Sequence, residues 1–249
     1  MAQIGAHAYI SVLLKTKIPY WKWFFPSFLL GSILPDIDYF FAKLHELVFI
    51  PSPLYLLNKT FTHSIFTTIF IYLLLLILYE IKKNKNIINI ANGLIVGIFL
   101  HILIDIFFWI EKIDLFWPLP MNPVHLWKIN LPEYIYKIIM TLEFVFFRGF
   151  AHYAIQAILN YPGKNSYLIK RQTIWMKAEL YFIIIFIVCS YYLSLYHLLV
   201  IFFLGYIPSI IMMLYTIVNI WDSLDYYPPN IKNETELDIK ERDNLININ

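Results

Sequence analysis

Three histidines and three aspartates stand out because they lie in or beside strongly apolar segments of the chain. Imidazole and carboxylate together form the ligand set that zinc and other first-row divalent ions prefer in proteins. A carboxylate that binds no metal can serve the same kind of site as a general base. Two of the groups are four residues apart and would share one face of a helix. The six residues are His7, Asp36, Asp38, His63, His101 and Asp105.

The composition is typical of a protein that crosses a membrane several times. Of its 249 residues 60% are hydrophobic and 14% are charged, and the mean hydropathy is +0.64. Soluble domains are much less apolar. The single cysteine, Cys189, excludes an internal disulfide and a cysteine-based zinc motif.

The apolar runs predict an all-α transmembrane bundle of about five or six spans plus a short N-terminal helix, because backbone polar groups in hydrocarbon must be paired within a segment. Pro35 and Pro208 interrupt two of the runs. The stretch 179–220 is too long for one span and predicts a hairpin that turns near Tyr196-His197. The expected segments are 4–14, 24–41, 65–81, 87–110, 134–158, 179–195 and 198–220.

The chain divides by charge into a membrane domain, residues 1–221, and a polar tail, residues 222–249. The tail holds 7 acidic and 3 basic residues and few large apolar ones. We expect it to be mostly disordered. Within the membrane domain, residues 1–120 contain all six site residues.

Basic residues predict the orientation of the bundle, because cytoplasmic loops are enriched in Lys and Arg. Ten of them fall in the turns 15–22, 82–86 and 159–177, against five in the alternate connections. With about 1.5 Å per helical residue from the basic turns, all six site residues reach one level in the opposite half. We therefore expect the site in the non-cytoplasmic half. The abundance of Ile, Asn, Lys and Tyr indicates an AT-rich genome, so we expect a multi-pass protein of a bacterial inner membrane or a plastid membrane.

Ionisable groups within a membrane are costly and usually mark a functional site. Six donors exceed the four of a tetrahedral zinc site, so either two metals bind or some of the six support the ligands or act as base. Each group also has a structural interpretation. Asp36 or Asp38 could cap a helix after Pro35, Thr62 could cap the next helix, and His7 could lie at the membrane interface.

Over about residues 1–120 the chain resembles the YdjM-like family of inner-membrane proteins. The resemblance rests on the motifs GAHAYI around His7, GSILPDID at 31–38, Thr-His-Ser at 62–64, His101-x-x-x-Asp105, and Trp117-Pro118. It implies a polytopic fold, a divalent metal held by these His and Asp positions, and metal-dependent hydrolase activity with a remote similarity to zinc-dependent phospholipase C.

One position departs from the family pattern. The family has a histidine where this chain has Asn58. An asparagine side chain is a poor zinc ligand, so either a second metal lacks a ligand at this position or Asn58 orients another group.

The leading functional hypothesis is a membrane-embedded, metal-dependent hydrolase. His63, His101, Asp105 and one or both of Asp36 and Asp38 would hold Zn²⁺ or a similar ion, and a free aspartate would act as base. A site at this depth reaches membrane lipids, which suggests a lipid ester or phosphoester as substrate. The basic residues are spread over turns and form no nucleic-acid footprint.

The alternative is a non-enzymatic membrane protein, either a transporter that uses the His/Asp set as an ion pathway or an assembly factor with a structural metal. Transporters often have two related halves with matching broken helices. Here the halves show no repeat, and no acid or histidine neighbours Pro208 in the sequence. Glu143, Arg148 and His152 in segment 134–158 indicate a buried ion pair or interfacial side chains, or else a contact for an anionic head group.

Overall fold

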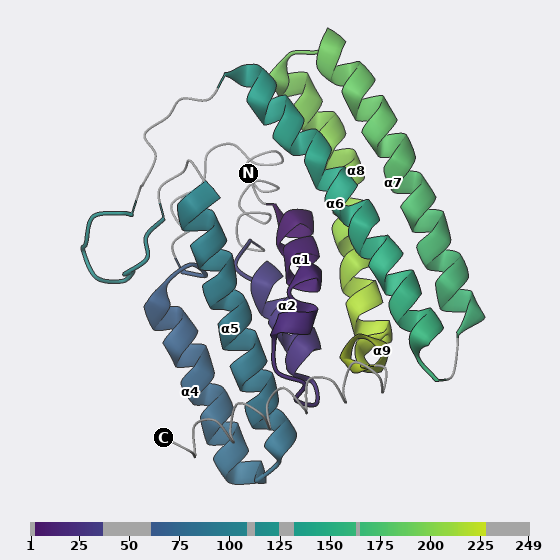
Figure 1. The fold of residues 1–249 in the computed structure, drawn as a ribbon. Coiled ribbons are helices and arrows are strands. Elements are labelled where there is room, and N and C mark those ends of the chain that lie inside the picture. The colour runs from purple at the N-terminus through teal and green to yellow at the C-terminus, as the bar shows by residue number, and fades with distance from the viewer. Residues whose placement is uncertain (1–2, 37–60, 109–112, 125–131, 163–164, 228–249) are drawn as a thin grey trace, which may run out of the picture.

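The computed structural model describes residues 3–36, 61–108, 113–124, 132–162 and 165–227. These residues form an all-α bundle, as the apolar runs predict (Figure 1). Five helices are long and apolar enough to cross a membrane: α4 (Ile65–Lys82), α5 (Lys85–Phe108), α6 (Glu133–Asn160), α7 (Ser166–Tyr192) and α8 (Leu195–Asn219). The short helices α1 (Ile4–Leu13) and α2 (Phe24–Ile33) precede them, and α9 (Trp221–Asp225) follows.

The helices fall into two groups, with α1 lying between them. In one group α2 packs along α5 and α4 covers the outer side of α5; in the other α6, α7 and α8 pack together (Figure 1). Phe144 and Phe147 on α6 meet Phe202 and Tyr206 on α8 in an aromatic core. Helix α1 packs on both α2 and α6, so it joins the two groups.

Helices α2 and α5 touch through their backbones. A Cβ atom added at Gly97 would lie 2.1 Å from the Phe28 carbonyl oxygen, and one at Gly93 would lie 2.3 Å from that of Phe24. Only glycine permits such an approach, which is how small residues four apart bring membrane helices together. The contact holds the C-terminal end of α2 against the part of α5 that carries His101.

The predicted interruption of segment 24–41 at Pro35 is confirmed. Helix α2 ends at Ile33 after ten residues and a turn follows at Leu34-Pro35. Proline has no amide hydrogen and cannot continue the hydrogen-bond ladder, so the interruption lies where the sequence predicts it. The described part of this segment is too short to count among the five spans. Residues 37–41 lie outside the described ranges.

Two other boundaries differ from the prediction. Helix α7 begins at Ser166 because the Asn165 side chain accepts hydrogen bonds from the amides of Tyr167 and Leu168. Most of the loop expected at 159–177 is therefore helix, with Lys170 and Lys177 on its exposed surface. The predicted hairpin between α7 and α8 is present, but it turns at 193–194 instead of at Tyr196-His197.

One end of the bundle collects the turns α1–α2, α4–α5 and α6–α7 together with α9 (Figure 1). Trp23 donates its amide hydrogen to Asp225 at 2.9 Å, and Lys15 donates to the carbonyl of Tyr226 at 3.0 Å. Leu224 is fully buried. Residues 222–227, the start of the expected tail, thus pack on the bundle, and 228–249 lie outside the described residues. The opposite end brings together the start of α1, the end of α2, the start of α4 and the end of α5.

Candidate metal centre

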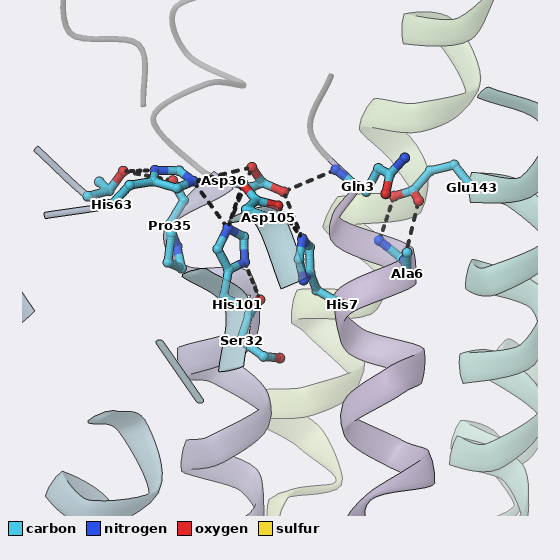
Figure 2. A network of polar contacts seen from close by, with 12 residues as sticks. Gln3, Ala6, His7, Ser32, Pro35, Asp36, His63, His101, Asp105 and Glu143 are labelled. Atoms are coloured by element: carbon cyan, nitrogen blue, oxygen red, sulfur yellow. Dashed lines mark hydrogen bonds and ion pairs between the residues drawn. The ribbon is translucent and has the colours of Figure 1, made fainter. Parts of the chain in front are cut away.

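Four separate parts of the chain place buried ionisable side chains at that opposite end (Figure 2). His7 lies on α1, Asp36 follows the turn after α2, and His63 directly precedes the first turn of α4. His101 and Asp105 lie one helical turn apart on α5, as their spacing predicts. None of the five is more than 2% exposed. Asp38 lies outside the described residues.

Four of the five side chains could share one ion. The Nε2 atoms of His63 and His101 are 3.2 Å apart, and Asp105 Oδ2 lies 3.3 Å from the first and 3.6 Å from the second. Asp36 Oδ1 is farther, at 4.0 and 3.9 Å. All four ligand atoms lie within 4.8 Å of one another. Tetrahedral ligands of zinc, at about 2.0–2.1 Å from the ion, are about 3.3 Å apart, so these residues fit such an ion.

The Nδ1 atoms of His63 and His101 each have a partner that fixes the tautomer of the ring. His101 Nδ1 lies 2.7 Å from the carbonyl oxygen of Ser32, which can only accept a hydrogen. Thr62 donates its single hydroxyl hydrogen to the Pro35 carbonyl at 2.8 Å, and therefore accepts from His63 Nδ1 at 3.1 Å. In the neutral rings both Nε2 atoms then carry lone pairs that face each other. This is the arrangement of histidines that bind a metal.

The break after α2 supplies these partners. Carbonyls at the end of a helix have no intrahelical donor, and here Ser32 and Pro35 offer theirs to His101 and Thr62. The expectation that Thr62 caps the following helix is wrong, because the N-cap of α4 is Ser64, whose hydroxyl accepts from the Phe66 amide at 3.1 Å. That hydroxyl also donates to the Trp117 carbonyl.

His7 lies beside the group of four and contacts the outer oxygens of both aspartates. Its Nε2 is 3.2 Å from Asp105 Oδ1 and 3.8 Å from Asp36 Oδ2, while its ring stacks on that of His101 with centroids 3.9 Å apart. Asp36 Oδ2 also accepts the amide hydrogen of Gln3 at 3.0 Å. Each carboxylate thus turns one oxygen toward the two Nε2 atoms and the other toward α1 (Figure 2).

Segment 134–158 contributes differently from the expected ion pair. The buried carboxylate of Glu143 accepts hydrogen bonds from the amides of Gly5 and Ala6 on α1. Arg148 donates to the carbonyl of Met176 on α7, and His152 is exposed. Glu143 and Arg148 therefore bind different partners. The signal that could have set Glu143 apart is a lone acid in the middle of an apolar span.

A second buried acid accompanies the proline of α8. Glu179 on α7 accepts hydrogen bonds at 2.5 Å from Trp175 Nε1 and from the hydroxyl of Ser209, the residue after Pro208. Glu179 is fully buried. Sequence inspection misses it because the acid comes from the neighbouring helix.

Fold and site together define an integral, multi-pass membrane protein whose buried His/Asp cluster is compatible with metal binding. A model of the YdjM inner membrane protein family matches residues 2–218. The chain belongs to this family, and the match extends well past the motifs of residues 1–120 into α8. No curated protein and no solved structure gives a significant match.

Proposed function

We propose that this protein is a membrane-embedded, metal-dependent hydrolase in which His63, His101 and Asp105 hold a divalent ion, with zinc preferred. The observation that carries the proposal is the convergence of two oriented Nε2 atoms and one carboxylate oxygen, all buried, with mutual distances of 3.2, 3.3 and 3.6 Å. Catalytic zinc sites commonly use three protein ligands and keep the fourth position open.

Asp36 is the proposed general base. Its Oδ1 stands 3.9–4.0 Å from both Nε2 atoms, farther than Asp105 Oδ2 from either. Asp36 is thereby placed beside the three ligands, where it can accept a proton from a water held there. A bound zinc ion would lower the pKa of that water to about 7 and polarise the scissile group. His7 holds the outer oxygen of Asp105 and so orients a ligand.

The depth of the site favours a lipid as substrate. Helix α5 has 24 residues and is about 36 Å long, more than the roughly 30 Å of the hydrocarbon core. Asp105 lies three residues before its end, so one end of α5 brings the cluster to the level of lipid head groups. Esters and phosphoesters of lipids lie at that level.

The test uses the full-length protein in lipid nanodiscs with added zinc. The bilayer contains either a fluorogenic carboxylic-ester lipid or a fluorogenic phospholipid, and soluble ester and phosphodiester probes serve as comparison. We expect zinc-dependent release from one lipid probe. Asp36→Asn should abolish release while zinc stays bound. His101→Ala should abolish both the release and the binding of zinc.

Release that is unaffected by a chelator or by Asp36→Asn would reject the hydrolase. Release from only the soluble probes would reject the lipid substrate.

One observation favours the alternative of an ion pathway. Glu179 bonds Ser209, the residue after Pro208, which gives the second half a buried acid next to a helix proline. The interruption expected at Pro208 is absent, because α8 is a continuous helix from Leu195 to Asn219. In proteoliposomes a transporter would show ion flux that Glu179→Gln removes, without lipid hydrolysis. The hydrolase predicts full lipid turnover in Glu179→Gln.

A further inference from the structure

Two carboxylates from different segments of the chain hold the N-terminus of α1. The first amides of a helix have no intrahelical acceptor, and they carry the positive end of the helix dipole. The N-cap residue Gln3 makes no side-chain cap. Instead Glu143 accepts from the amides of Gly5 at 2.5 Å and Ala6 at 3.2 Å, while Asp36 accepts from that of Gln3 (Figure 2).

Gly5 and Glu143 are matched in shape as well as in hydrogen bonding. A Cβ atom at position 5 would lie 3.0 Å from the Glu143 carbonyl oxygen and 3.1 Å from its carboxylate Oε1. Those contacts are tighter than most Cβ contacts, so Glu143 would have to move by a few tenths of an ångström to accommodate a side chain at position 5. The absence of a side chain at Gly5 thus lets α1 approach α6 closely enough for both amide hydrogen bonds.

His7 follows Ala6 directly, so the cap fixes its position. Its Nε2 meets Asp105 Oδ1 at 3.2 Å and its ring stacks on His101. Glu143 lies on α6, in the half of the chain that contributes no other group to the cluster among the described residues.

We infer that Glu143 is a positioning residue of the metal centre: from α6 it caps α1 and thereby sets His7 against Asp105 and His101. The second half of the chain then completes the site without supplying a ligand. The effect of Glu143 on zinc affinity rests on the proposed function, whereas its effect on amide exchange of α1 does not.

The experiment measures zinc affinity of the purified full-length protein and amide hydrogen exchange of the α1 peptide. The variants are Glu143→Ala, Gly5→Ala, His7→Ala and the double variant Glu143→Ala/His7→Ala. Glu179→Ala is the matched control, because Glu179 is also a fully buried acid of the second half but bonds Trp175 and Ser209.

We expect Glu143→Ala and Gly5→Ala each to weaken zinc binding about 10- to 100-fold, the usual effect of removing a group that orients a ligand. Amides of α1 should exchange faster in both variants. His7→Ala should weaken zinc binding by a similar factor, and the double variant should bind zinc no more weakly than His7→Ala. Glu179→Ala should match the wild type in zinc affinity and in α1 exchange.

Unchanged α1 exchange in Glu143→Ala would overturn the inference. So would a double variant in which the two losses of zinc affinity multiply, or a Glu179→Ala protein that loses as much zinc affinity as Glu143→Ala. If the wild-type protein binds no zinc, the proposed function fails, and exchange alone decides the role of Glu143. Faster exchange confined to α1 then supports the cap, and unchanged exchange rejects it.

Discussion

At the scale of single residues, the hydroxyl of Thr62 decides which nitrogen of His63 faces the cluster. It donates to the Pro35 carbonyl and accepts from His63 Nδ1. Thr62→Val keeps the shape of the side chain but removes both bonds. We expect zinc affinity to fall about 10- to 100-fold, because the ring loses the partner that orients it. Isothermal titration of the purified protein with zinc measures the change.

Thr68→Val is the matched control. Thr68 is buried, whereas Thr62 is half-buried, and its hydroxyl bonds the Ser64 carbonyl within α4 instead of the cluster. Zinc affinity should stay at the wild-type value in this variant. A Thr62→Val protein that binds zinc as tightly as Thr68→Val would mean that the hydroxyl does not orient His63.

The sequence allowed the convergence of His7, Asp36, His63 and the α5 pair to be predicted, because depth along a helix follows from residue count. The roles within the cluster could not be predicted. The packing of the helices decides that Asp36 lies farther than Asp105 from the two Nε2 atoms. It also decides that His7 contacts the outer oxygens of the two carboxylates. The Glu143 bond to α1 joins residues 138 positions apart, which spacing does not reveal.

At the scale of helices, the backbone contact between α2 and α5 brings Ser32 to His101. Gly97→Leu would place side-chain atoms where the Phe28 carbonyl lies, since even Cβ would be 2.1 Å from that oxygen. We expect the helices to separate, with a loss of about 1–3 kcal/mol or more in the free energy of unfolding and weaker zinc binding. Thermal unfolding in detergent and zinc titration measure the two effects.

Val96→Leu is the comparison for Gly97→Leu, because Val96 is exposed on the same helix. Val96→Leu should change neither the free energy of unfolding nor the zinc affinity. Equal behaviour of the two variants would show that close contact of α2 and α5 is not needed for the site.

Helix boundaries were harder to predict than helix identity. The apolar run beginning at 179 marks only the second half of α7. The first half contains several charged and polar residues, so hydropathy does not show that the helix extends back to its cap at Asn165. The pair Gly93-x-x-x-Gly97 was the available signal for the α2–α5 contact. The interruption of segment 24–41 could be predicted, because Pro35 has no amide hydrogen for a continuing helix.

At the scale of the whole molecule, Lys15 connects the α1–α2 turn to residues 226–227, which follow α9. Its Nζ lies 4.5 Å from the ring centroid of Tyr227 and 5.1 Å from that of Phe25. Burial lowers the pKa of Lys15 from 10.5 to about 8, although Asp225 opposes the shift. Between these values the unfolded chain holds the proton and the folded protein does not, so this group makes the protein more stable as pH rises.

The pH dependence can be measured from thermal unfolding in detergent at pH 7.5 and 9.5. Compared with Lys15→Met, the wild type should gain stability over this interval. Lys17→Met, which alters an exposed lysine of the same turn, should keep the wild-type pH dependence. If the stability of the wild type and of Lys15→Met changed equally between pH 7.5 and 9.5, this role of Lys15 would be excluded.

The basic turns predict the orientation of the bundle. In a protein whose Cys189 is replaced by serine, a cysteine at Asn84 in the α4–α5 turn should be shielded from an impermeant thiol reagent added to the non-cytoplasmic side. A cysteine at Met121, which is 57% exposed, should react. The reverse labelling would place the cluster in the cytoplasmic half.

The central claim is that the buried His/Asp cluster holds a metal ion. Elemental analysis of the full-length protein after zinc loading and removal of free metal tests it most directly, with His63→Ala, Asp105→Ala and the exposed His152→Ala as variants. We expect about one zinc per chain in the wild type and in His152→Ala, and little zinc in His63→Ala and Asp105→Ala. A wild-type protein without zinc, or equal zinc in all four proteins, would contradict the claim.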